Sequence, residues 1–196
     1  TPGPFTFWAS SVSVRSDLGY RDNVLQSATN QHSSLFSGLG ADVFVFRMPV
    51  DGTSFSLFFS ADDRRYFDAL EATTNGPGAT KEQSFITHAT LKKTLPKGWS
   101  VSLVGMHVYA DQVFDASELE NGLGSVLAQV HQFTFTPSLR RDFGAGLWTE
   151  AGFTVGRQEF REPVSSFWEG GPKLTLGWGY RTNSSVELAF SAVRRA

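Results

Sequence analysis

Four histidines are the residues of this 196-residue chain most suited to catalysis or metal binding. His88 and His107 flank the break at Pro96-Lys-Gly98, so a hairpin would place them on adjacent strands. The spacing of the four histidines defines no third metal ligand beside His88 and His107, and the chain has no cysteine. We therefore expect the histidines to act as polar filling, and we predict no metal site and no cofactor.

A hydrolase would need a serine, a histidine and an acid in contact. The chain has no Gly-x-Ser-x-Gly sequence, the turn that presents the nucleophile in many serine hydrolases. The acidic stretch Asp115-Ala-Ser-Glu-Leu-Glu120 lacks the glycine-centred spacing of a calcium loop. We predict that the protein is not an enzyme. A membrane-embedded lipid hydrolase, acting through His88, His107 or His131, is the weakest alternative.

The overall composition excludes some partners. A net charge of -2 and a pI of about 6.1 offer no electrostatic basis for binding nucleic acid.

Charged residues make up 18% of the chain, below the roughly 25% of soluble domains. No apolar run reaches the roughly 18 residues of a spanning helix, so a membrane segment would have to belong to a β-barrel. No signal peptide is visible in the sequence, which opens at Thr1-Pro-Gly-Pro4, and in a mature chain or an excerpt this absence carries no information.

The stretch from Lys173 to Phe190 alternates strictly between apolar and polar residues around a polar break, Arg181-Thr-Asn-Ser184. A period of two is the strand period, so the stretch predicts a β-hairpin with one apolar and one polar face. Similar runs recur along the chain and predict an all-β fold, an antiparallel up-and-down meander of about 9–10 long strands. The expected strands lie near residues 4–15, 34–48, 53–65, 84–95, 99–110, 123–137, 146–157, 172–181 and 185–194.

Short and long connections alternate along this series, and an outer-membrane barrel has the same plan, with short periplasmic turns and long outer loops. The long loops are expected near residues 16–33, 66–83, 110–122 and 158–170. We therefore expect Asp51, Lys97, Asp142 and Asn183 to share one rim, the periplasmic one, and Asn23, Asn75, Asp115 and Pro163 to share the outer rim.

Strand length and residue placement favour lipid over a soluble core. A run of about ten residues, tilted by about 40°, spans about 25 Å, the height of a transmembrane apolar band. Aromatic residues gather at strand ends, where membrane barrels carry their girdles. The predicted girdle is Tyr66, Trp99, Tyr109, Trp168, Trp178 and Tyr180. The few charges inside the strands must then face the lumen: Asp42, Asp62, Lys92, Glu150, Lys173 and Glu187.

Two of the expected strands are apolar on both sides. Phe44 and Phe46 alternate with Val43 and Val45, and residues 99–110 behave similarly. Two-sided apolarity suits a buried strand. It keeps open a soluble, calycin-like barrel that binds a small hydrophobic ligand with its apolar side chains pointing inward.

Gly19-Tyr-Arg-Asp-Asn-Val24 is followed by a serine-containing polar loop and then by a long alternating strand, and the third expected strand ends in Ala61-Asp-Asp-Arg-Arg-Tyr-Phe-Asp68. With these motifs the first third of the chain resembles the opening hairpin of Gram-negative outer-membrane β-barrel proteins of the porin type. The resemblance implies a narrow porin-like channel or a structural component of an outer-membrane assembly. The implied partners are the lipid bilayer and other outer-membrane or periplasmic proteins.

Such barrels end in a strand with a terminal aromatic residue, whereas this chain stops at Val193-Arg-Arg-Ala196. An odd number of strands is also unusual for a bacterial barrel. We therefore interpret residues 1–196 as a single β-barrel domain, either whole or part of a longer barrel.

Overall fold

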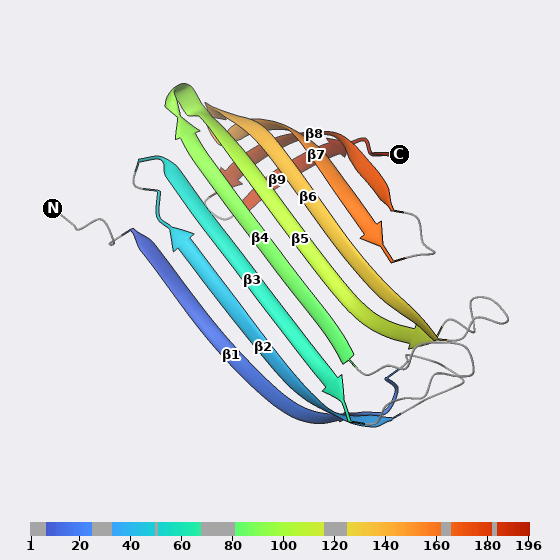
Figure 1. Cartoon of the computed structure of the whole chain (residues 1–196). Helices are drawn as coiled ribbons and strands as arrows, with labels where there is room; N and C mark the ends of the chain where they lie inside the picture. The colour runs from blue at the N-terminus through green and yellow to red at the C-terminus, as the bar shows by residue number, and fades with distance from the viewer. Residues whose placement is uncertain are drawn as a thin grey trace.

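The computed structural model describes residues 7–24, 33–49, 51–67, 81–115, 125–161, 166–181 and 184–196, and these form one antiparallel sheet. Apart from a single 3-10 turn at Pro96–Gly98 (η1), the regular elements of the described chain are strands, so the predicted all-β class is confirmed (Figure 1). The strands are β1 Trp8–Arg21, β2 Ser34–Arg47, β3 Thr53–Tyr66, β4 Lys81–Leu95, β5 Trp99–Asp115, β6 Ser125–Gly144, β7 Leu147–Phe160, β8 Phe167–Arg181, β9 Ser184–Ser191 and β10 Arg194–Arg195.

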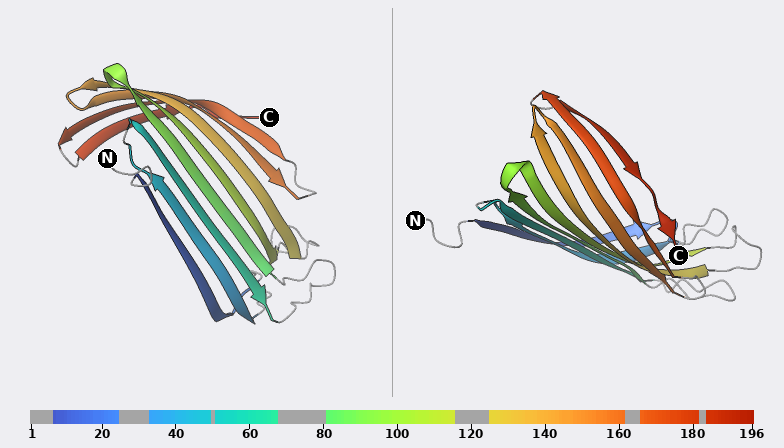
Figure 2. Two further views of the ribbon diagram at one scale, coloured as in Figure 1. Left: turned by 60° about the vertical axis from the view of Figure 1, so that its left-hand side comes forward. Right: turned by 90° about the horizontal axis from the view of Figure 1, so that it is seen from above.

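Each strand pairs antiparallel with its sequence neighbour from β1 to β9, which confirms the predicted meander. The two residues of β10 pair with β8 beyond the end of β9, so both short strands occupy the same position beside β8. The sheet curls strongly but is not closed, because no pairing joins β1 to β9 or β10 in the described residues (Figure 2).

Several strands run further than the sequence suggested, among them β5, which continues to Asp115, and β8, which begins at Phe167. β1 continues to Arg21, because Leu18 and Tyr20 keep the alternation of Val12 and Val14 through a stretch expected to be loop. β6 continues to Gly144, although proline cannot donate to a ladder and its Pro137 has no register partner on β7. The strand survives this proline because Pro137 keeps its position opposite Leu103 of β5.

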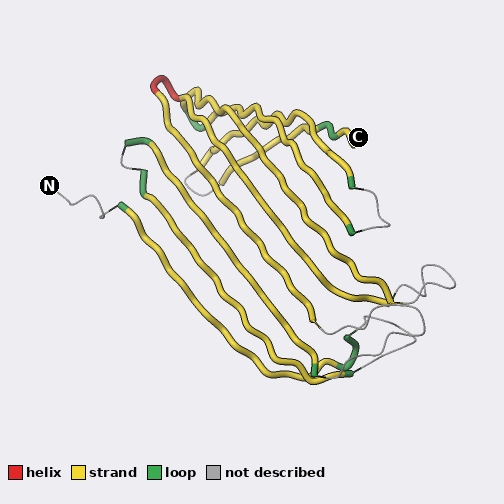
Figure 3. Tube along the Cα trace, in the orientation of Figure 1, coloured by secondary structure: helices red, strands yellow, loops and turns green. Residues whose placement is uncertain are grey.

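The connections separate the sheet into two ends (Figure 3). We call the end that carries Asp51, Lys97 and Asp142 the turn end, and the end that carries Asn23 and the last residues of β5 the loop end. This grouping matches the expected one for the residues that the structure describes. Asn75, Pro163 and Asn183 lie outside the described residues.

The hairpins of the turn end depend on left-handed backbone. Gly52 has φ 73°, Lys97 and Gly98 have φ 62° and 75°, and Gly146 has φ 79°. Glycine adopts these angles without a steric penalty. The turns also touch the neighbouring strands, since the Gly179 N–H donates to the Gly146 carbonyl over 3.0 Å.

Replacing Gly146 by alanine should destabilise the β6–β7 hairpin. The new Cβ would sit at positive φ and clash with the Gly179 carbonyl oxygen, a cost of about 1–3 kcal/mol. Urea titration of the folded protein measures the change. Gly105→Ala is the matched control, because a Cβ there meets no atom within 4 Å. Equal stability of the two variants would contradict the assignment.

Asp51 braces the β2–β3 turn as a charged acceptor. Its carboxylate accepts the Thr53 N–H over 3.0 Å and an Arg47 N–H over 3.3 Å. The Thr53 N–H, followed by Arg47, lowers the pKa of Asp51 to about 2. A depressed carboxylate pKa stabilises the folded state above the unfolded pKa, near 4, and this contribution is lost as pH falls through about 2.

Asp51→Asn should therefore lower the melting temperature at pH 7 and have a much smaller effect at pH 2, where about half of the wild-type carboxyl is protonated. Melting curves of both proteins between pH 2 and pH 7 provide the measurement. A difference that stays constant across this range would show that the charge of Asp51 contributes nothing.

Candidate functional site

The register assigns each strand residue to one face of the sheet, since paired residues point to the same side. Leu174, Leu176 and Trp178 of β8 share a face with the apolar residues that they oppose on β9. The same face continues across the sheet without a charge in its middle. One row through it comprises Ser10, Val45, Leu57, Ala89, Gly105, Phe135, Val155 and Gly170.

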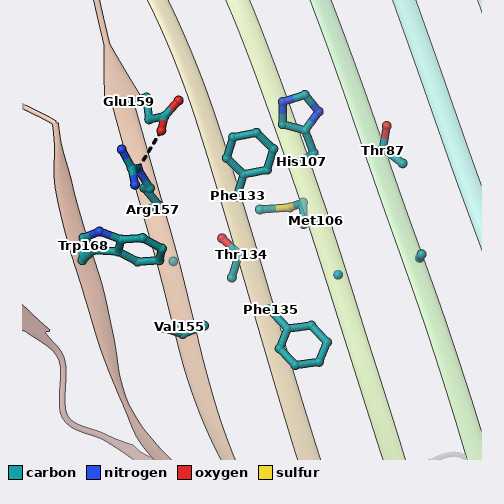
Figure 4. Close-up of a pocket in the computed structure, with 13 residues that line it drawn as sticks. Thr87, Met106, His107, Phe133, Thr134, Phe135, Val155, Arg157, Glu159 and Trp168 are labelled. Carbon is teal, nitrogen blue, oxygen red and sulfur yellow. Dashed lines mark ion pairs between the residues drawn. The ribbon is translucent and has the colours of Figure 1, made fainter.

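The opposite, more polar face lies on the inside of the curl. Arg21 of β1 reaches Glu82 of β4 over 2.8 Å although two strands lie between them. Flat neighbouring strands stand about 4.8 Å apart, so three spacings are about 14 Å. The side chains bridge this distance because the face is concave. Figure 1 and Figure 4 look at the other face, from which β8 and β9 curl away. We call the two surfaces the concave face and the convex face.

The convex face carries an apolar band between two polar rims. On β5 the band runs from Trp99 to Tyr109, and on β8 from Trp168 to Trp178. On β4 it lies between Gln83 and Lys93. Each pair is ten positions apart, which corresponds to a band about 25 Å high after a tilt of about 40°. Large apolar side chains within it are exposed, such as Val14 at 76% and Phe153 at 50%.

Cations and aromatic rings mark the turn-end rim of this band. Arg47, Lys93 and Arg141 lie on the convex face at the ends of β2, β4 and β6. The Arg141 guanidinium lies 4.8 Å from the Trp99 ring centre. Tyr109 marks the loop-end rim: its hydroxyl donates to Asp111 over 3.2 Å and accepts from Gln129 over 3.0 Å.

Of the predicted girdle, Trp99, Tyr109, Trp168 and Trp178 lie on the convex face at both rims. Tyr66 differs from the expectation, because it lies on the concave face, where it accepts a hydrogen bond from Arg21 over 3.0 Å and is 7% exposed. The period of two already put Tyr66 on the same face as Asp62, four residues earlier on β3. The side chain of Tyr180 lies outside the described part of the chain.

The six charged residues predicted to face a lumen share one face, the concave one: Asp42, Asp62, Lys92, Glu150, Lys173 and Glu187. Sequence reasoning missed Arg15, which holds two of them. It pairs with Asp42 and, over 2.8 Å, with Asp62, while Ser60 donates to Asp42 over 2.7 Å. Arg15 stands at a polar position of an alternating strand, and this position could have identified it as a partner of the lumen-facing carboxylates.

The concave face is not uniformly polar. Phe44, Phe58, His88 and Met106 follow one another in a single row across β2 to β5. Phe44 also stacks on Phe46, with ring centres 6.4 Å apart. This patch accounts for the two-sided apolarity of β2, because both faces of that strand carry apolar side chains.

A shallow apolar recess of about 580 Å³ interrupts the convex face (Figure 4). Ala89 and Gly105 lie side by side in its lining. Phe133 and Phe135 of β6 flank it, and an Arg157–Glu159 ion pair of 2.6 Å lies beside it. Small residues at two adjacent positions leave this space empty of side chains. The recess therefore belongs to the apolar band.

The expected placement of His88 and His107 on adjacent strands is confirmed, but their side chains are not neighbours. His88 and His107 are on adjacent strands but on opposite faces, because His88 pairs with Met106. His107 instead approaches His131, with Nε2 and Nδ1 3.4 Å apart. No group of three or more His, Cys, Asp or Glu side chains suited to a metal ion occurs in the described part of the chain.

The described residues contain no helix long and apolar enough to cross a membrane. Models of known protein families give no match to this sequence, and the curated proteins contain no similar one.

Arg21 should stabilise the sheet more than an exposed arginine does. Removing it in Arg21→Ala leaves Glu82, whose side chain is 16% exposed, without its cation, an effect of about 1–3 kcal/mol. Arg65→Ala is the control, because the Arg65 side chain is 72% exposed and its surface ion pair contributes little. Chemical unfolding of Arg21→Ala, Glu82→Ala and the double variant yields the coupling energy. Additive losses would contradict the bridge.

Proposed function

We propose that this sheet is the wall, or part of the wall, of a β-barrel in the Gram-negative outer membrane, serving as a narrow porin-like channel or a structural component of an outer-membrane assembly. The observation that carries the proposal is the convex apolar band, about 25 Å high and bounded by aromatic and charged rims. The concave face, with its ion pairs and hydroxyls, would line the interior.

The position of the apolar face distinguishes the proposal from its soluble rival. A calycin-like barrel that holds a hydrophobic ligand would turn its apolar side chains inward. Here Leu174, Phe153 and Val14 are on the outside of the curl, and the ion pairs Arg15–Asp62 and Arg21–Glu82 are on the inside. A convex surface of this kind favours a lipid bilayer as the partner.

The proposal also requires the sheet edges to be paired. Backbone groups exposed along β1 and β9 would find no water inside a bilayer, and each unsatisfied group costs several kcal/mol. In the membrane these edges would pair with each other, with further strands or with another outer-membrane protein. The turn end would face the periplasm and the loop end the exterior.

Solubility and folding in lipid test the proposal directly. The protein should need detergent or lipid to stay folded, and an unheated sample should migrate differently from a boiled one on a gel. It should also insert into phospholipid vesicles. A folded, monodisperse species in plain buffer would overturn the proposal.

Val14→Arg tests the orientation of the faces. Val14 lies in the middle of β1 and is 76% exposed, so an arginine there costs almost nothing in water but about 2–4 kcal/mol at a lipid midplane. Ser13→Arg, one position along, faces the concave side beside Asp42 and serves as the control. Vesicle-insertion yield and unfolding in lipid should fall only for Val14→Arg. Equal behaviour of the two variants would argue against a lipid-facing surface.

A further inference from the structure

We infer that the turn-end half of the concave face binds small oxyanions, inorganic phosphate among them. The candidate site is a cavity of about 320 Å³ crossed by five consecutive strands, β4 to β8. Its charged lining consists of Lys92, Arg140, Lys173 and Glu150. This inference rests on the proposed function only in so far as the concave face is open to water.

The register explains how residues far apart in sequence come to line one cavity. Lys92, Ser102, Ser138, Gly152 and Lys173 occupy one row across β4 to β8. The two lysines thus stand at the ends of the row, and the small residues between them form the floor. A side chain at Gly152 would crowd β6, because a Cβ there would come within 3.1 Å of the Pro137 carbonyl oxygen and 3.2 Å of the Ser138 Cβ.

The charges of the cavity do not balance within the described structure. Arg140 is held by Asp142 over 2.8 Å, and its guanidinium lies 4.0 Å from the Trp148 ring centre. Neither lysine forms an ion pair or a hydrogen bond with another described side chain, and the remaining lining carboxylate is Glu150. Two ammonium groups therefore face one carboxylate across the cavity.

The loop-end half of the same face differs in this respect. Arg64 there lies over the Phe36 ring, 5.5 Å from its centre, and the other two arginines are matched, Arg15 by Asp42 and Asp62, and Arg21 by Glu82. Like Arg140, they are engaged by neighbouring carboxylates. The ammonium groups of Lys92 and Lys173 are instead left to the solvent or to a ligand.

The neutral lining supplies donors of the kind that an oxyanion accepts. Ser100, Ser102, Thr136 and Ser138 bring four hydroxyl groups to the cavity. Each hydroxyl can donate one hydrogen bond, and each ammonium group up to three, to phosphate or sulfate oxygens. Glu150 opposes anion binding, so its charge should limit the affinity.

Phosphate titration of the protein folded in detergent micelles tests the inference, by calorimetry at constant ionic strength with chloride as the counter-ion. Lys92→Gln and Lys173→Gln should each weaken phosphate binding about tenfold, the loss expected for one charge-assisted hydrogen bond. Glu150→Gln should tighten it, a gain that misfolding cannot imitate. Lys93→Gln is the matched control, because Lys93 stands on the convex face beside Lys92 and should leave the affinity unchanged.

Absence of phosphate binding by the wild-type protein would overturn the inference. An equal loss in Lys93→Gln would do the same, because it would reveal a non-specific effect of net charge. The result is separable from the proposed function: a protein that inserts into vesicles but binds no phosphate refutes only the anion site. A water-soluble protein that binds phosphate refutes only the membrane wall.

Discussion

The antiparallel hydrogen-bond ladder, held in one register from β1 to β9, is the constraint on which the rest of the structure depends. Side chains alternate between faces with a period of two, so a slip of one residue in any pair would exchange the apolar and the charged set. Apolar residues pair with each other across neighbouring strands, as Leu176 does with Leu188 and Val43 with Phe59. Such pairs hold the register between one strand and the next. The separation into two faces follows from this register alone.

Curvature turns these two faces into two environments. On the concave side the side chains converge, so Arg21 reaches Glu82 and Arg15 reaches Asp62 across intervening strands. On the convex side they diverge, and residues such as Val14 and Phe153 remain exposed in the described structure. Exposed apolar surface on this scale is uncommon in soluble monomers. A bilayer around the convex face would cover it.

The turn end shows how local chemistry supports this arrangement. Gly52, Gly98 and Gly146 adopt left-handed backbone, and a Cβ at Gly98 would come within 2.5 Å of the Asp142 carbonyl oxygen of the next hairpin. The tight turns are thus packed edge to edge as well as folded individually. Neighbouring turns are separated only by the distance between strands. Residues close to them on different strands, Lys92, Arg140 and Lys173, therefore line one cavity.

The sequence by itself determined the strands, their approximate bounds, the antiparallel meander and the sharing of one face by Asp42, Lys92, Glu150 and Lys173, because all of these follow from a period of two and from turn-forming residues. Only the tertiary structure decided which face is convex, since alternation is the same whichever way a sheet curls. It also separated His88 from His107 and brought Arg15 to Asp62. Contacts of this kind depend on the register and curvature of several strands together, and no single run of residues encodes them.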